Sequence, residues 1–209
     1  MADDHTHDHE HDHEHDHAHE HDHEHDHDEA TERALEEEKA RLRRQALAQI
    51  RQYPDVALRM KAREVTEFDE FLIQLVERMQ HLMQDAQGVG LAATQVGVLR
   101  RLFVFQPSED EVLAVANPEI VERSEETDVA DEGCLSIQGI TVPVERALEV
   151  TIVGKDETGA DVRYELDGYA ARCVQHENDH LDGVLMIDRT TPEARRGALG
   201  ALRPRIVLT

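Results

Sequence analysis

The chain has 209 residues and a formal net charge of −24, from 22 Lys and Arg against 46 Asp and Glu. This length allows one ordinary domain with extensions. The negative charge argues against a general nucleic-acid binder and against specific binding of DNA, because affinity for phosphates requires clustered Lys and Arg. The chain has no apolar run of about 18 residues and no secretory signal pattern, so we expect no membrane span and no membrane partner. Two cysteines, Cys134 and Cys173, cannot form a disulfide framework, and we therefore expect a cytoplasmic location.

The N-terminal residues 3–29 have low complexity, with His at every odd position from His5 to His27 and mostly Asp or Glu between. Such a segment has no apolar surface to bury, so we expect residues 1–30 to form a disordered tail. Two interpretations of this tail remain open. It is a solvated leader, or it is a weak store for extra divalent metal ions, because imidazoles and carboxylates both bind such ions.

The next segment is charged and rich in Ala and Leu, which predicts an exposed helix over Glu32–Arg51, with residues 31–44 as a helical linker. The folded domain is expected over residues 45–190. Its clearest helix is Thr66–Ala86, where Thr66 and Asp69 resemble a capping box. The apolar residues of this helix follow the i, i+3, i+4 spacing of one face, namely Phe68, Phe71, Leu72, Leu75, Val76, Met79, Leu82 and Met83.

Several short strands are expected between this helix and a second one. Asp167 is predicted to cap the second helix, which runs from Gly168 to about Leu181. Helix, strands and helix without regular β-α alternation indicate an α+β fold, with short antiparallel strands packed around a central helix. The expected strands are Arg101–Phe105, Val112–Ala116 (ended by Asn117-Pro118), and a hairpin of Leu148–Val153 with Val162–Leu166.

The C-terminal residues 191–209 are expected to form a basic extension. Arg189–Thr209 contains five Arg and one Glu. Such a patch is typical of a solvated helix, and contact with ribosomal RNA is the alternative interpretation.

The second helix carries the pattern H-E-x-x-H at His176-Glu177-Asn178-Asp179-His180. Two His at positions i and i+4 share one helix face and can reach one metal ion, and the Glu beside the first His is placed as a general base. The pattern also occurs by chance on exposed helices. A metallopeptidase is a rival hypothesis, but where one peptidase class has a third His, this chain has Met186.

Cys173 on the same helix and two further stretches, residues 132–136 and 88–95, contain candidate site residues. Cys173 lies three residues before His176, but the helix rise places it roughly 7 Å from the midpoint of the two His along the axis, which favours a buried structural thiol. Cys134 lies in Glu-Gly-Cys-Leu-Ser at residues 132–136 and, taken alone, is equally typical of a buried small residue. Residues 88–95 are Gly-rich and end in Gln95, which is either an amide donor at a site or a turn cap.

Taken together, these stretches resemble the peptide deformylase family. That family carries G-x-G-L-A-A-x-Q, E-G-C-L-S and Q-H-E-x-D-H in this order, and here they stand at residues 88–95, 132–136 and 175–180. The resemblance covers roughly residues 45–190, and it extends to the shorter segments 52–55, 65–68, 117–118 and 180–183. It implies a metal-dependent hydrolase that removes the formyl group from the N-terminal methionine of newly synthesised proteins.

The resemblance also implies a role for each site residue. Cys134, His176 and His180 are implied as ligands of one Fe²⁺ per chain, with Zn²⁺ or Ni²⁺ as possible substitutes. Glu177 is implied as the group that moves protons. The resemblance further assigns Gln95 and the backbone N–H of Leu135 to the oxyanion, and Gly90 and Val89 to the substrate peptide. The implied partners are N-formylmethionyl nascent peptides and the ribosome.

Two features depart from the family pattern. After Ser136-Ile137 the family usually has a Pro and, three residues later, a long side chain, whereas this chain has Gln138 and Thr141. The His-rich tail also lies outside the pattern, and a metal-buffering protein with a degenerate domain is therefore a second rival. Intact Glu177 and Gln95 argue against it, because metal storage requires neither.

Overall fold

The structure, a computed structural model, describes residues 22–202, with side chains from Thr31 onward. Residues 1–21 of the expected tail and residues 203–209 of the expected basic extension lie outside the described residues. The chain divides into two units, residues 1–39 and 40–209, and each is described by itself. Within residues 22–202, no helix is long and apolar enough to cross a membrane.

The first helix, α1 (Asp22–Leu47), differs at both ends from the expected helix over Glu32–Arg51. It begins inside the segment for which composition predicts disorder. Starting a helix is costly, but extending it is not, so the Ala-, Glu- and Leu-rich centre continues outward. At the other end the chain turns after Leu47, and Ile50 is thereby buried in the core.

The strands form two antiparallel sheets, which confirms the α+β class. The larger sheet has the order β1-β2-β3-β6-β7, so the short β1 is an edge strand, and the smaller sheet is the hairpin β4–β5. The predicted hairpin of β6 and β7 is present. The strand bounds are β1 (Gly90–Ala92), β2 (Leu102–Ser108), β3 (Glu111–Arg123), β4 (Thr127–Cys134), β5 (Ile137–Ala147), β6 (Glu149–Lys155) and β7 (Asp161–Asp167).

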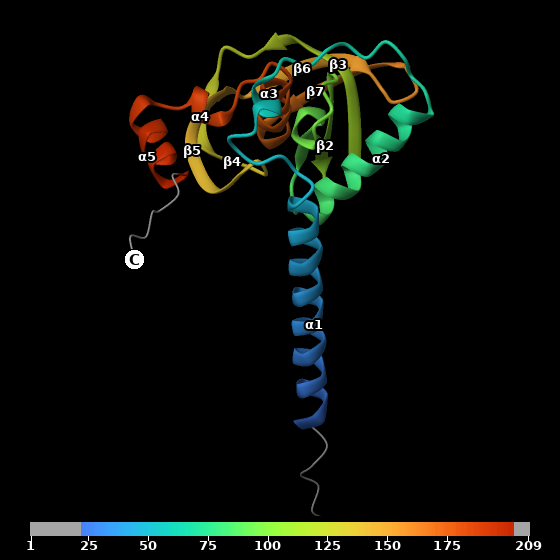
Figure 1. The fold of residues 1–209 in the computed structure, drawn as a ribbon, viewed down its shortest axis with the longest axis vertical. Helices are drawn as coiled ribbons and strands as arrows, with labels where there is room; N and C mark the ends of the chain where they lie inside the picture. Colours follow the sequence, from blue (N-terminus) through green and yellow to red (C-terminus); the bar gives the residue numbers. More distant parts are fainter. Residues whose placement is uncertain (1–21, 203–209) are drawn as a thin grey trace, which may run out of the picture. The chain divides into compact units, whose positions relative to one another are not determined.

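Helix α3 (Gly168–Leu181) lies between the two sheets and contacts strands of both (Figure 1). Its bounds agree with the predicted helix, although the side chain of Asp167 makes no capping hydrogen bond. Its buried face includes Ala171, Val174 and Leu181. The other helices are α2 (Glu70–Asp85), α4 (Met186–Arg189), α5 (Pro192–Leu202) and two 3₁₀ turns at Val56–Arg59 and Ala93–Val96.

Helix α2 begins later than the predicted start at Thr66. Its N-cap is Asp69, whose carboxylate accepts a hydrogen bond from the backbone N–H of Leu72 at 3.1 Å. A carboxylate also stabilises the positive end of the helix dipole, so this cap is the stronger of the two candidates. The predicted apolar face is buried from Leu72 onward, but Phe71 is exposed.

Strand β3 does not stop at Asn117-Pro118, so the predicted end of that strand is wrong. Asn117 adopts a left-handed conformation with φ 51°, and the register with β6 shifts between Ala116 and Glu119. One extra residue is therefore accommodated as a β-bulge, where the missing N–H of Pro118 costs no ladder hydrogen bond. The Asn117 side chain instead binds the backbone N–H and C=O of Val65, at 2.8 and 2.9 Å.

Helix α5 packs against β5, and Ala198 is buried in a cluster with Val142, Val144 and Ile187. The predicted boundary between the domain and a basic extension, at residue 190, therefore lies within packed structure. Arg195 near its start pairs with Asp188 at 3.0 Å. The described part of the extension is thus anchored by apolar burial and by an ion pair.

Candidate metal centre and active site

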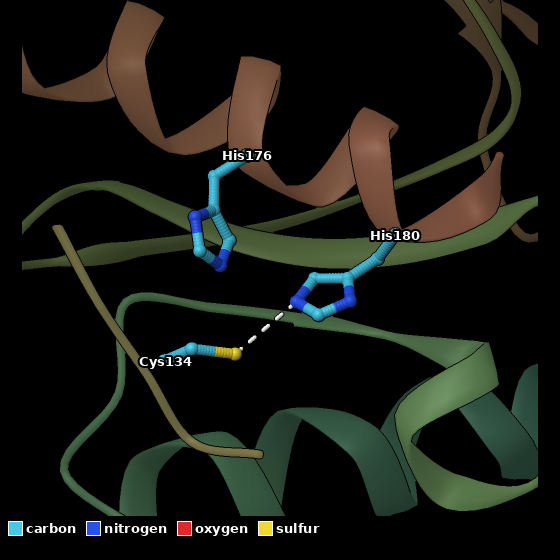
Figure 2. A group of neighbouring side chains, drawn as sticks. All are labelled: Cys134, His176 and His180. Atoms are coloured by element: carbon cyan, nitrogen blue, oxygen red, sulfur yellow. Dashed lines mark hydrogen bonds between the residues drawn. The ribbon is translucent and has the colours of Figure 1, made fainter. Parts of the chain in front are cut away.

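Three side chains from two distant segments converge beside α3. His176 and His180 project from one face of α3, and Cys134 lies at the end of β4, where the hairpin turns toward the helix (Figure 2). The Sγ atom of Cys134 is 3.2 Å from Nε2 of His180. One donor atom of each residue lies within 4.8 Å of those of the other two.

This donor set fits a metal ion. Glu132 Oε2 lies 3.0 Å from Nδ1 of His176, which leaves Nε2 of that ring for the centre. Burial is the main reason why the pKa of His180 is well below the ordinary value, so this ring is held neutral, the form that ligates metals. Burial opposes protonation of His176, yet hydrogen bonds with Cys134 and Glu132 raise its pKa well above the ordinary value. The surroundings therefore favour positive charge at this point.

Glu132, behind His176, belongs to a buried ion network. Its carboxylate accepts hydrogen bonds from Arg146 at 2.9 and 3.0 Å and from Arg172 at 3.0 Å. Arg146 also donates to Asp179 on α3 at 2.6 Å. Burial alone would raise the pKa of Glu132, but the hydrogen bonds from His176 and Arg146 lower it to about 2. The network therefore keeps an anion against His176 and fixes the ring.

Glu177 is buried beside the centre. Its Oε2 atom has no hydrogen-bond partner among the described residues. Burial raises the pKa of Glu177 to about 7, and the negative charge of Glu132 adds to this effect, while His176 opposes it. A carboxyl group whose pKa lies near neutrality can both accept and release a proton, as a general acid–base requires.

Gln95 lies near Cys134, in the 3₁₀ turn that follows β1. Its Oε1 accepts a hydrogen bond from the backbone N–H of Ala92 at 2.8 Å, which fixes the amide orientation. Its Nε2 then points to Ser136 Oγ at 3.1 Å and to Cys134 Sγ at 3.6 Å. The structure thus brings an oriented amide donor to the centre, and half-buried Leu135, next to Cys134, lines the same cavity.

The edge strand β1 forms one wall of this cavity. The carbonyl of Val89 accepts a hydrogen bond from Gln106 N on the β2 side, at 2.9 Å. Because backbone direction alternates along an antiparallel strand, the N–H and C=O of Gly90 face the free edge. A Cβ at Gly90 would collide with Glu177 Oε1 and with Cys173 Sγ, so only glycine allows this approach. Val89 lines the cavity, but its carbonyl is already occupied.

The cavity has a volume of about 360 Å³ and reaches from the metal centre to the surface. Gln138 and Thr141, the two departures from the family pattern, both line it. Cys173 does not join the donor cluster. Its Sγ lies 3.3 Å from the carbonyl oxygen of Val89, in agreement with the predicted structural thiol.

Sequence reasoning missed the supporting groups. Glu132 stands two residues before Cys134, and a carboxylate so close to a candidate ligand was the available signal for a partner of His176. Arg146 and Arg172 come from separate elements and give no local signal. Arg43 at the end of α1 also lines the cavity, and in the sequence it is one of many charges on an exposed helix.

A family model, curated relatives and solved structures all match this chain to the same family. The polypeptide deformylase model matches residues 47–196. The peptide deformylase of Thermotoga maritima is 49% identical over 146 residues, 70% of this chain and 88% of that protein. Peptide deformylase 1 of Corynebacterium glutamicum is 44% identical over 161 residues, 76% of this chain and 95% of that protein. A peptide deformylase from Synechococcus elongatus in complex with actinonin matches with a TM-score of 0.70 and 38% identity, over 73% of this chain and 85% of that one.

Proposed function

The chain belongs to the polypeptide deformylase family, so it is a metal-dependent hydrolase that removes the N-terminal formyl group of nascent peptides, and we propose that Cys134, His176 and His180 hold its metal ion. The observation that carries this proposal is the convergence of these three donors beside a buried glutamate, next to a cavity that Cys134, His176 and the edge strand β1 help to line. The substrates are N-formylmethionyl peptides, and the products are formate and a peptide with a free amine.

Fe²⁺ is the metal that the family resemblance implies, and we propose it here, with Zn²⁺ or Ni²⁺ as substitutes. Thiolate and imidazole ligands suit each of these ions. When bound, such an ion supplies a Lewis acid that activates water and polarises the formyl carbonyl. Because the protein would supply three ligands, such an ion could also bind water or substrate.

The protein groups perform the remaining steps. Glu177 takes the proton of the attacking water on a carboxylate oxygen and transfers it to the amine nitrogen that leaves when the C–N bond breaks. Gln95 Nε2 and the backbone N–H of Leu135 stabilise the negative charge on the formyl oxygen. The free edge at Gly90 holds the peptide as an added strand, and Val89 contributes side-chain contact.

This function is tested by measuring formate release from formyl-Met-Ala-Ser under anaerobic conditions, with the chain loaded with Fe²⁺, Zn²⁺ or Ni²⁺ in turn. We expect stoichiometric formate and free Met-Ala-Ser. Highest turnover with Fe²⁺ would support the proposed metal. Acetyl-Met-Ala-Ser serves as a control, because the proposed reaction removes a formyl group and we expect no release of acetate. Release of internal fragments instead of formate would support a metallopeptidase.

We further propose a cytoplasmic location and action at the ribosome, because the substrate is a chain under synthesis. The C-terminal segment 191–209 is the proposed ribosome contact, on account of its Arg content. For the tail, residues 1–30, we propose weak binding of extra divalent metal ions by its His and acidic residues.

A further inference from the structure

The end of α1 contributes a charged side chain to the active-site cavity. Arg43 lies in the unit formed by residues 40–209 and lines the cavity together with residues 87–90. It stands before residue 47, where the match to the family model begins. This chain thus adds to its cavity a group from outside the segment matched to the family.

The guanidinium of Arg43 is positioned, and most of its donors remain available. Its Nε donates a hydrogen bond to the carbonyl oxygen of Ala86 at 3.2 Å, at the C-terminal end of α2. Among the described residues no carboxylate forms an ion pair with Arg43. A guanidinium has five N–H donors in a planar fork, so both terminal amino groups remain to bind a carboxylate.

The other charged side chains that line the cavity are paired, buried or negatively charged. Arg172 is paired with Glu132 at 3.0 Å and with Asp128 at 3.4 Å, and Glu177 is buried at the metal centre. Among the described lining residues, Arg43 is therefore the one cation without a carboxylate partner. The exposed Asp131 is an anion elsewhere on the same lining.

The course of the backbone relates Arg43 to the reacting end of the substrate. Gly90 touches Glu177, and the chain runs back from Gly90 to Ala86, where Arg43 is anchored. Four residues span at most about 13 Å, and an extended peptide advances about 3.3 Å per residue. A substrate with its formyl group at Glu177 that runs along residues 90 to 86 would have Arg43 within reach of one of its first four residues.

We propose that Arg43 is a specificity-determining residue that favours formylated peptides with an Asp or Glu side chain at one of positions two to four. The inference rests on the proposed function. The carboxylate would form a charge-assisted, bidentate hydrogen bond with the two free amino groups. This preference is local, because the strongly negative net charge of the chain otherwise disfavours acidic peptides.

The test uses the metal-loaded full chain and formyl-Met peptides. Asp, Asn or Lys is placed in turn at position two, three or four, and a fourth kind of peptide is neutral at all three positions. The quantity compared is the ratio of kcat/KM for the Asp peptide to that for the Asn peptide. At low salt we expect a ratio above one at a single position, which falls about 2- to 5-fold in Arg43→Gln, mainly through KM. Arg43→Glu should shift the preference to Lys at the same position.

Arg44→Gln is the matched control, because it removes the same charge from the next residue, which does not line the cavity. Far-UV circular dichroism and the kcat/KM for the neutral peptide establish whether each variant is folded. An unchanged Asp/Asn ratio in Arg43→Gln, or an equal fall in Arg44→Gln, would overturn the inference while deformylation itself stands. No formate from any peptide would overturn the proposed function and this inference with it.

Discussion

Glu177 combines burial, a carboxylate oxygen without a hydrogen-bond partner within residues 31–202, and a pKa raised to about 7, and these properties suit a group that moves protons without binding the metal. We predict that Glu177→Ala retains one metal ion per chain and loses about 10²- to 10⁴-fold in kcat. Metal content by atomic emission and formate release on the same sample measure both effects. A variant that loses its metal would identify Glu177 as a ligand, and one that keeps its rate would refute the proton-transfer mechanism.

The two cysteines provide a second test, because only Cys134 lies in the donor cluster. We predict that Cys134→Ser lowers metal occupancy and abolishes turnover. Cys173→Ser should retain metal and lower the free energy of unfolding by roughly 1–3 kcal/mol, since Cys173 is buried and packed against β1. Metal analysis and urea denaturation distinguish the two variants.

Thiol reactivity in the unmutated chain tests the same assignment. A coordinated thiolate is protected from alkylation, so a chelator should expose half-buried Cys134 to iodoacetamide and leave buried Cys173 unmodified. Mass spectrometry of the labelled peptides gives the site. If Cys173→Ser removes the metal and Cys134→Ser retains it, the assignment of ligands is wrong.

At the scale of elements, the β4–β5 hairpin shows why part of the site escapes sequence reasoning. β4 (Thr127–Cys134) has three acidic residues and more exposed positions than buried ones, and only Glu132 is fully buried along it. The alternation of apolar residues that marks a half-buried strand is therefore absent. The side chain that faces inward is charged, and its burial depends on Arg146 and Arg172, which come from other elements. No local pattern encodes such a partner.

Elements with their own apolar period were predicted more closely. The face of α2 from Leu72 to Met83 follows from apolar spacing. The β6–β7 hairpin follows from two strand-like runs, and the bounds of α3 agree with the prediction although the Asp167 side chain makes no capping hydrogen bond. The errors lie where a single residue decides between local alternatives, as at the Asp69 cap and at Asn117, whose side chain is bound by Val65. Tertiary contacts decide those cases, and a single sequence does not show them.

The ion network between β5 and α3 gives a prediction at this scale. Arg146→Met should lower the free energy of unfolding by about 1–3 kcal/mol, because Glu132 and Asp179 lose the cation that they share and keep only Arg172 and Arg189 as their respective arginine partners. Urea denaturation of the metal-loaded protein measures this change. Arg163→Met is the control, since its ion pairs with Glu122 and Glu165 are exposed and are worth less than about 1 kcal/mol. Equal losses of the free energy of unfolding in both variants would show that the buried network contributes no more to stability than the exposed ion pairs of Arg163.

For the whole molecule, the fold brings together three stretches separated by up to about ninety residues, and the sequence motifs identified which stretches belong together. Gln95, Cys134 and the two His of α3 meet because β1 is an edge strand and the β4–β5 hairpin turns toward α3. The cavity wall at Arg43 could not be predicted in this way. That residue lies outside the family match, and only the structure places it beside residues 87–90.

The last prediction concerns the chain as a whole and separates the tail from the catalytic unit. Deletion of residues 1–30 should leave kcat and KM for formyl-Met-Ala-Ser nearly unchanged under metal-replete conditions, because every proposed site residue and Arg43 lie in the unit of residues 40–209. The deletion should lower the total Zn²⁺ bound per chain, because it removes 12 of the 15 His. Equilibrium dialysis and steady-state kinetics on the same preparations measure both quantities.

A full-length control with Gln at all tail His positions from His5 to His27 keeps the length and the acidic charge of the tail. It should bind as little extra Zn²⁺ as the truncated chain if imidazoles provide the sites, and as much as the parent chain if carboxylates alone do. One ion per chain in all three forms would refute metal storage and leave the tail as a solvated leader. Loss of turnover on truncation, with metal in excess, would instead place the tail in the active site and contradict the boundary between the two units.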